Sequence, residues 1–263
     1  MTKIQDPMLS FEEELNMYLA GNSIDCVIFG YEHQELKILL LQWKHHPVWS
    51  LPGGFIRKDE DMNEAANRVL IERTGLKSVY LNQFRTFGSV ARSELHKNAQ
   101  FMRLDLFKKS EVFSAKTIAW LTKRFITTGY FALVDIEKTS PKPDFLSAKC
   151  EWKSLKDTPP LLLDHNDIVQ KALEHLRIRL NYLPIGASLL PHKFTMQDLQ
   201  KLYEAILQKP LERSNFQRKL LKLDFLNRHE KQMTGAANKA PYLYSFDMIK
   251  YEKLIKQGIG FSF

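Results

Sequence analysis

The chain has 263 residues and is 44% hydrophobic, which is enough for the core of one large domain or two ordinary ones. It has no apolar run of membrane-spanning length, and MTKIQDPMLSFEEELNMY lacks the basic-then-apolar pattern of a signal peptide, so we expect a cytoplasmic protein. Two distant cysteines, Cys26 and Cys150, indicate reduced thiols rather than a disulfide framework or a zinc site.

The net charge of +8 is concentrated at one end of the chain. Residues 191–263 hold 13 Lys and Arg against 7 Asp and Glu, a net charge of +6, whereas the first 190 residues carry only +2. This asymmetry favours a C-terminal module that binds a polyanion. A solvated basic surface is the alternative.

The first elements predict a β-hairpin. Ile24–Gly30 and Lys37–Trp43 are two β-rich runs, and a polar turn at residues 31–35 separates them. His45 and His46 follow in the loop. Neighbouring residues on a strand point apart and no third ligand is placed nearby, so we interpret both histidines as loop residues rather than metal ligands.

The next stretch, LPGGFIRKDEDMNEAANRVLIERTGL at residues 51–76, predicts a glycine turn, an acidic loop and an amphipathic helix. Gly53 and Gly54 permit a tight turn. Asp61 and Glu64 have the spacing of a capping box, and Gly75 ends the helix. An apolar stripe at i, i+3, i+4, i+7 and i+8 should face the core: Met62, Ala65, Ala66, Val69 and Leu70.

This stretch resembles the Nudix box. The matching positions are Gly54, Glu60, Arg68, Leu70, Glu72, Gly75 and Leu76. Two positions depart from the pattern, because Val69 and Arg73 stand where the box has glutamates. We expect Glu60 to pair with Arg68 and to brace the loop against the helix.

The two departures bear on chemistry. Positions 69, 72 and 73 share one helix face, where three carboxylates would hold divalent cations against a pyrophosphate. Only Glu72 remains as a metal ligand, so we predict no catalytic residue, no metal centre and no cofactor. The remaining cleft should instead bind a small ligand, and its candidate residues are Lys44, Phe55, Arg68, Glu72 and Arg73.

Further elements complete a first domain at residues 1–190. Strands are expected at Val79–Gly88, Ile126–Asp135 and Cys150–Leu155, and Asp164 should cap a helix that runs to Tyr182. Its inner face holds Ile168, Ala172, Leu173, Leu176 and Leu180. Residues 91–124 form an insertion that could be a lid, a dimer element, an extra hairpin or a plain surface loop.

Residues 191–263 predict a second, basic domain. Thr195 and Asp198 start a helix with the apolar face Leu199, Leu202, Tyr203, Ile206 and Leu207. A second helix begins near Arg213, with Phe216, Leu220 and Leu223 inside. Residues 226–228 and 242–246 flank the tip MTGAANKAP like a wing hairpin.

The outward face of the second helix has the chemistry of a recognition helix, because Arg and Asn pair with base edges and Lys pairs with phosphates. The wing adds further cations. The candidate DNA-binding residues are Arg213, Asn215, Arg218, Lys219, Lys222, Arg228 and Lys239, with Lys231 as a further phosphate contact.

The segment FTMQDLQKLYEAILQKPLERSNFQRKLLKLDFL is similar to the C-terminal part of the Nudix-related transcriptional regulators. The resemblance implies an α+β protein, with a Nudix fold (a mixed sheet between helices) followed by a winged helix-turn-helix. It also implies a dimeric repressor of transcription that binds double-stranded DNA. The effectors in this family are ADP-ribose-type nucleotides or pentoses such as L-arabinose.

Two other functions stay open. The chain could be an active Nudix hydrolase that uses Glu72 with carboxylates from outside the box, for example Glu94 or Asp164. It could also be an interaction or RNA-binding module. Single-strand binding calls for exposed aromatic side chains, and the outer face of the second helix has none.

Overall fold

The structure is a computed structural model that describes residues 15–44, 47–77, 79–92, 114–121, 123–180, 185–232 and 240–257. His45, His46, Glu94 and Lys239 lie outside these residues, as do most of the predicted insertion and the wing tip. The chain forms two compact units, residues 1–28, 38–132 and 139–172, and residues 29–37, 133–138 and 173–263. The domain boundary near residue 190 stays a prediction.

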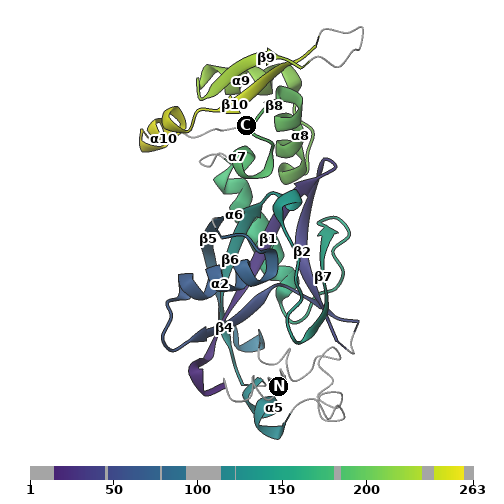
Figure 1. Ribbon diagram of the computed structural model, residues 1–263, viewed down its shortest axis with the longest axis vertical. Helices are drawn as coiled ribbons and strands as arrows, with labels where there is room; N and C mark the ends of the chain where they lie inside the picture. Colours follow the sequence, from purple (N-terminus) through teal and green to yellow (C-terminus); the bar gives the residue numbers. More distant parts are fainter. Residues whose placement is uncertain are drawn as a thin grey trace, which may run out of the picture. The chain divides into compact units, whose positions relative to one another are not determined.

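A seven-stranded sheet organises the N-terminal part, in the order β3-β2-β1-β6-β5, with β4 paired to β1 and β7 paired to β2 (Figure 1). The strands are β1 (Tyr18–Glu32), β2 (Glu35–Trp43), β3 (Trp49–Ser50), β4 (Gly53–Arg57), β5 (Tyr80–Phe87), β6 (Ile126–Val134) and β7 (Ser147–Ser154). The helices here are α2 (Met62–Thr74), α5 (Ala115–Leu121), α6 (His165–Arg179), η1 (Leu15–Met17) and η2 (Ile136–Lys138). The predicted Nudix fold is therefore confirmed, including the β1–β2 hairpin.

The hairpin turn is tighter than predicted. His33 and Gln34 occupy it with φ values of 51° and 62°, the left-handed conformation that two-residue hairpin turns need. The core lies along the middle strands and α6. The five inner residues predicted for α6 are all buried, with at most 1% of their surface exposed.

The Nudix-like stretch at residues 51–76 has the predicted local structure except at two points. Asp61 and Glu64 form the capping box, and Gly75 ends α2 with φ 77°. Met62 is wrongly predicted as core: it is 39% exposed, because it is the first residue of α2 and precedes the turns that pack on the sheet. Gly53 and Gly54 lie in β4 rather than in a turn.

Close packing explains why β4 begins with two glycines. A Cβ on Gly53 would lie 2.7 Å from Asp25 Oδ1 and 2.8 Å from the carbonyl of Ile24, and one on Gly54 would lie 2.9 Å from Cγ2 of Val69. The missing side chains let β4 approach β1 on one side and α2 on the other. The buried Val69 is thus part of the packing that seats the box helix.

The C-terminal elements form a winged helix, as predicted. They are α7 (Ile185–Leu189), β8 (Phe194–Thr195), α8 (Met196–Leu207), α9 (Arg213–Lys222), β9 (Leu226–Lys231), β10 (Tyr242–Phe246) and α10 (Met248–Lys256), and the strand order is β8-β10-β9. Strand β8 and helices α7 and α10 were not predicted. Among the helices in the described ranges, none has the length and apolarity needed to cross a bilayer.

A single carboxylate sets the turn between α8 and α9. Glu204 accepts hydrogen bonds from Lys201 and from the backbone N–H of Leu211, at 2.9 and 3.0 Å. These bonds hold the pKa of Glu204 at about 2. Because Leu211 immediately precedes the N-cap Glu212 of α9, the ionised carboxylate fixes where the second helix begins.

We predict that Gly53→Ala destabilises the protein, because backbone and a buried carboxylate block the new methyl group. The expected loss in free energy of unfolding is about 1–3 kcal/mol, measured by urea denaturation. Gly88→Ala is the matched control, since its Cβ would meet only Ile126 carbons at 3.6 Å and should change stability by less than about 1 kcal/mol. Equal losses in both variants would contradict this account of β4.

Candidate functional site

The box helix keeps one carboxylate of the metal face, and two arginines hold it. Oε2 of Glu72 lies 2.9 Å from Arg73 Nη2, and Oε1 lies 3.7 Å from Arg68 Nη1. Arg68 also forms an ion pair with Glu60, as predicted, with 2.6 Å between Arg68 Nη2 and Glu60 Oε1. Burial alone would raise the pKa of Glu60, but hydrogen bonds from Arg68 and the backbone N–H of Arg57 bring it below its usual value.

Arg73 has a structural task as well. Arg73 is 9% exposed, and its guanidinium donates to the carbonyl oxygen of Lys142 at 3.2 Å. The backbone N–H of Lys142 donates to the carbonyl of Arg73 in return, at 3.0 Å. Among the residues that the structure describes, no three His, Cys, Asp or Glu side chains are grouped as metal ligands. The face that would hold cations is occupied by fixed positive charge.

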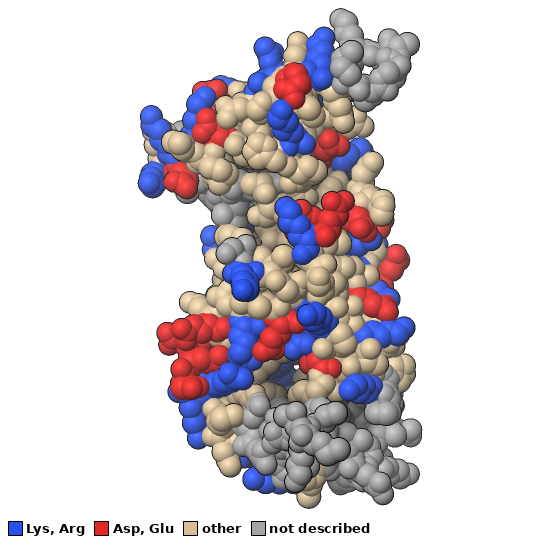
Figure 2. Space-filling model, in the orientation of Figure 1, with Lys and Arg blue, Asp and Glu red and all other residues tan. Residues whose placement is uncertain are grey.

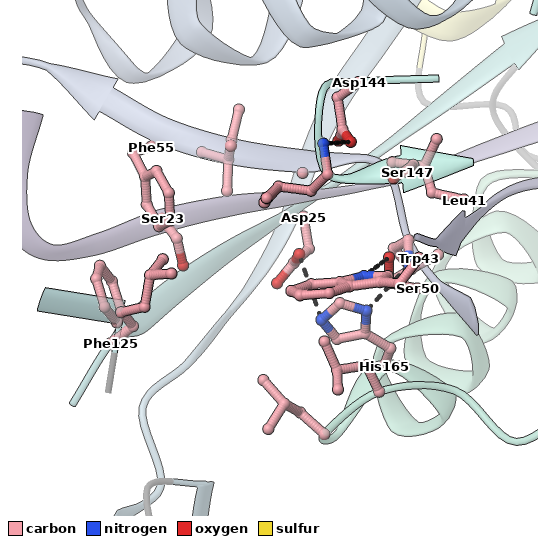
Figure 3. Close-up of a pocket in the computed structure, with 18 of the residues that line it drawn as sticks. Ser23, Asp25, Leu41, Trp43, Ser50, Phe55, Phe125, Asp144, Ser147 and His165 are labelled. Atoms are coloured by element: carbon pink, nitrogen blue, oxygen red, sulfur yellow. Dashed lines mark hydrogen bonds and ion pairs between the residues drawn. The ribbon is translucent and has the colours of Figure 1, made fainter. Parts of the chain in front are cut away.

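A cavity of about 180 Å³ lies between β1, β4, α5 and the start of α6. Figure 3 shows Asp25 and His165 together at its polar part, with Phe55 and Phe125 on the other side. Ser23, Ser50, Asp144 and Ser147 add polar groups to the lining. Apolar side chains complete it: Ile24, Leu41, Trp43, Leu51, Ile118, Leu121, Leu146, Leu162 and Leu163.

A buried ionic network closes the polar part of this cavity. Arg92, which is 4% exposed, donates through Nε to Asp164 Oδ1 at 2.8 Å and through Nη2 to Asp25 Oδ2 at 3.2 Å. Two carboxylates thus share one guanidinium. Arg92 is the only Lys or Arg among the described residues that line the cavity, and its charge is already neutralised.

His165 belongs to the same network. Its Nδ1 accepts the backbone N–H of Leu51 at 3.0 Å, so the ring proton is on Nε2, which lies 3.5 Å from Asp25 Oδ1. Burial lowers the pKa of His165, although Asp25 opposes the shift, and the ring is neutral at pH 7. The imidazole therefore holds the start of β4 near α6 without adding positive charge to the cavity.

Helix α5, which lies in the C-terminal part of the predicted insertion, contributes to the apolar wall of the cavity. Helix α5 places Trp120 edge-on against Phe55, with ring centroids 4.5 Å apart, and Trp120 also contacts Phe125 at 5.1 Å. Tyr18 joins this cluster, 5.7 Å from Phe55. The insertion thereby supplies Ile118 and Leu121 to the cavity.

Only one of the five predicted ligand residues lines the cavity. Phe55 does so; Arg68, Glu72 and Arg73 lie together on the box helix, and Lys44 is exposed. Sequence reasoning missed the polar cavity residues, among them Asp25, Arg92 and His165. Asp25 carried a signal, because it is a charge inside an apolar strand and therefore needs a buried partner. Asp164, predicted as a helix cap or an outside carboxylate for hydrolysis, is the second partner of Arg92.

The second candidate surface is the outer face of α9. Arg213, Arg218 and Lys222 are exposed, Asn215 and Lys219 are half-buried, and Arg228 is exposed on β9. Arg218 Nη2 donates to Asn215 Oδ1 at 3.1 Å, so these two side chains form one unit. Ser214 and the 42% exposed Leu221 share this face and were not predicted. Figure 2 shows Lys and Arg standing out over the winged-helix elements.

Helix α9 packs against the domain through apolar residues on its inner face, so its outer face remains exposed. Phe216 and Leu220 are buried, and Phe216 packs edge-on against Tyr203 of α8 with ring centroids 5.4 Å apart. The N-cap Glu212 accepts the backbone N–H groups of Ser214 and Asn215 at 2.8 and 2.6 Å. The helix is thus held from its inner side and its first turn.

Comparisons with known proteins agree with both halves of this description. A family model described as the NUDIX domain matches residues 20–176, and one described as the NrtR DNA-binding winged helix domain matches residues 186–246. The chain is 30% identical to the "ADPR responsive transcriptional repressor NtrR" of Acinetobacter baylyi over 238 residues, which are 88% of this chain and 83% of that protein. The chain belongs to the Nudix-related transcriptional regulators.

Solved structures support the same assignment. The crystal structure of Shewanella oneidensis NrtR has a TM-score of 0.63 and 27% identity, covering 86% of this chain and 94% of that one. The same protein complexed with a 27mer DNA has a TM-score of 0.62 and 26% identity, covering 91% and 96%. In both, the likeness extends over the Nudix and winged-helix parts.

We predict that Arg92→Met lowers the free energy of unfolding by about 3–5 kcal/mol, because it leaves two carboxylates without their shared buried cation. Thermal or urea unfolding measures the loss. The control is Lys138→Met, which removes a surface ion pair whose lysine is 74% exposed and should change stability by less than about 1 kcal/mol. If Arg92→Met were as stable as the control variant, the network would not hold the fold together.

Proposed function

We propose that the chain is a DNA-binding transcriptional repressor, active as a homodimer, whose Nudix domain senses a small ligand and does not hydrolyse it. The observation that carries the proposal is the combination of a basic recognition face on α9 with a box helix whose one remaining metal carboxylate is held by Arg68 and Arg73. The name of the Acinetobacter baylyi relative, a repressor that responds to ADPR, supports it.

The absence of hydrolysis follows from the charges on the box helix. Cations bind a Nudix helix because several carboxylates converge on one face. Here an incoming magnesium ion would have to displace Arg73 and Arg68 from Glu72 and would then find no second carboxylate at position 69 or 73. A site that binds a ligand but lacks the means to cleave it is suited to sensing.

The cavity favours an uncharged, hydroxyl-rich ligand of pentose size. Its volume of about 180 Å³ is below the roughly 300–1,000 Å³ of sites that enclose drug-sized molecules. Aromatic and aliphatic walls suit the C–H faces of a sugar ring, while Asp144 and the serines suit its hydroxyls. The positive charge of Arg92 is already paired with two carboxylates, so it is not available to bind a diphosphate.

ADP-ribose is the second candidate effector, favoured by the relative's name. Its diphosphate would need cations, and the nearest positive charges on the box helix, Arg68 and Arg73, are already paired with carboxylates. A nucleotide of this size would therefore place only its terminal ribose in the cavity.

We predict that L-arabinose or another pentose changes operator affinity by roughly 5- to 150-fold, the usual range of allosteric coupling. The measurement titrates pentoses and ADP-ribose against the full-length protein on a duplex selected from a random pool. Asp144→Asn should weaken the response, since it keeps an acceptor for the backbone N–H of Leu146 but removes the charge. Glu72→Gln should leave the pentose response unchanged.

The opposite pattern of ligand responses would place the ligand-binding site elsewhere. If only ADP-ribose acted and Glu72→Gln abolished its effect, the ligand would bind the box-helix face instead of the cavity. Magnesium-dependent cleavage of ADP-ribose at about one turnover per second or faster would make the chain a hydrolase.

We predict that the dimer binds a pseudo-palindrome whose half-sites are about one or two helical turns apart. Arg218→Ala should relax base preference at one position by about 1–3 kcal/mol, because Arg reads base edges. Lys222→Ala should weaken all duplexes equally and lower the salt slope by about one unit, because Lys contacts phosphate. Lys138→Ala, which lies outside the winged-helix elements, is the control. If the affinity for duplex DNA changed neither with salt concentration nor with either α9 substitution, α9 would not be the recognition helix.

A further inference from the structure

The base of the wing holds an unusual pair of cations. Arg228 Cζ lies 4.7 Å from the ring centroid of Tyr242, and Lys231 Nζ lies 5.3 Å from the same centroid. Both distances are within the range of cation–π attraction. One aromatic ring on β10 therefore gathers two positive charges from β9.

Strand register makes this arrangement possible. Residues three apart on a regular strand point to opposite faces of the sheet. Here Tyr242 pairs with Lys231 while Tyr244 pairs with Arg228, so β9 has one more residue than β10 between the two pairs. This irregularity is a β-bulge, which re-aims side chains. Because of it, Arg228 and Lys231 both reach Tyr242.

The two residues between these cations are engaged elsewhere. His229 Nε2 lies 2.8 Å from Ser245 Oγ, and Glu230 pairs with Lys193 at 2.6 Å. Within the described part of the chain, neither Arg228 nor Lys231 forms an ion pair with a carboxylate. Arg228, Lys231 and the 41% exposed Tyr242 thus all face solvent.

We propose that Tyr242 is a positioning residue, which holds Arg228 and Lys231 together as a two-cation site for the phosphodiester backbone of duplex DNA. The proposal rests on the proposed function, and it assigns Tyr242 and Lys231 a joint role. Two neighbouring cations without a carboxylate favour an anion, and ring contacts reduce the rotamer freedom that each long side chain loses on binding. The site contacts phosphate and not base edges, so it contributes affinity without sequence preference.

The test measures binding of the full-length protein to a mixed-sequence 30-base-pair duplex by fluorescence anisotropy over a series of KCl concentrations. Tyr242→Phe keeps the ring and should bind within about 2-fold of the unmodified protein. Tyr242→Leu and Tyr242→Val remove the ring and should bind roughly 3- to 10-fold more weakly. Their salt slope should stay the same, because both cations remain.

A variant without the two cations shows whether Tyr242 acts by positioning them or only by stabilising the fold. Arg228→Ala with Lys231→Ala should lower the salt slope by about two units, and adding Tyr242→Leu to that pair should cause no further loss. The proposal is overturned if Tyr242→Leu binds like the unmodified protein, if Tyr242→Phe is as weak as Tyr242→Leu, or if the ring still matters after both cations are gone. Failure of the unmodified protein to bind any duplex would instead refute the proposed function.

Discussion

The ion pairs of the buried Arg92 guanidinium are the interaction on which the cavity of the Nudix domain depends. It joins Asp25 in the middle of β1 to Asp164 at the start of α6, and its own position follows β5. An unpaired carboxylate inside an apolar strand would be costly, so the strand, the segment after β5 and the helix start must come together for any of them to be stable. The same neutralisation leaves the described lining of the cavity with polar groups and no unpaired cation. One buried guanidinium therefore underlies both fold stability and the ligand preference proposed for the cavity.

The two residues of the box helix that depart from the Nudix pattern both contribute to the fold. Val69 fills the space against Gly54, where a carboxylate would be buried. Arg73 ties the end of α2 to Lys142, and the same segment leads to Asp144 in the cavity wall. Both departures from the Nudix pattern thus add packing or hydrogen bonds while they remove metal ligands. The loss of two metal-binding carboxylates is thus accompanied by contacts that anchor the cavity wall, which suits the proposed sensor.

Sequence reasoning succeeded where the rule is local. The capping boxes at Asp61 and Thr195, the Glu60–Arg68 pair and the inner face of α6 each follow a spacing rule along one continuous stretch of chain. It failed where distant segments meet: Arg92 contacts partners 67 and 72 residues away, in a stretch without periodicity. Helix α10 was also not predicted, and Tyr251 is the buried residue among its described side chains. The bulge in β9 also depends on strand pairing that no short motif specifies.

Arginine serves opposite purposes in the two parts of the chain, and its partners decide which. Arg68, Arg73 and Arg92 each meet a carboxylate, so their charge is used within the fold. Arg218 contacts the neutral Asn215, and Arg228 contacts the ring of Tyr242, so their charge is oriented but not cancelled. An oriented, uncancelled cation is the group that a polyanion such as DNA can bind without first breaking an ion pair. The C-terminal excess of positive charge is therefore significant because the winged helix gives Arg218 and Arg228 neutral partners, which fix their positions and leave their charge for the nucleic acid.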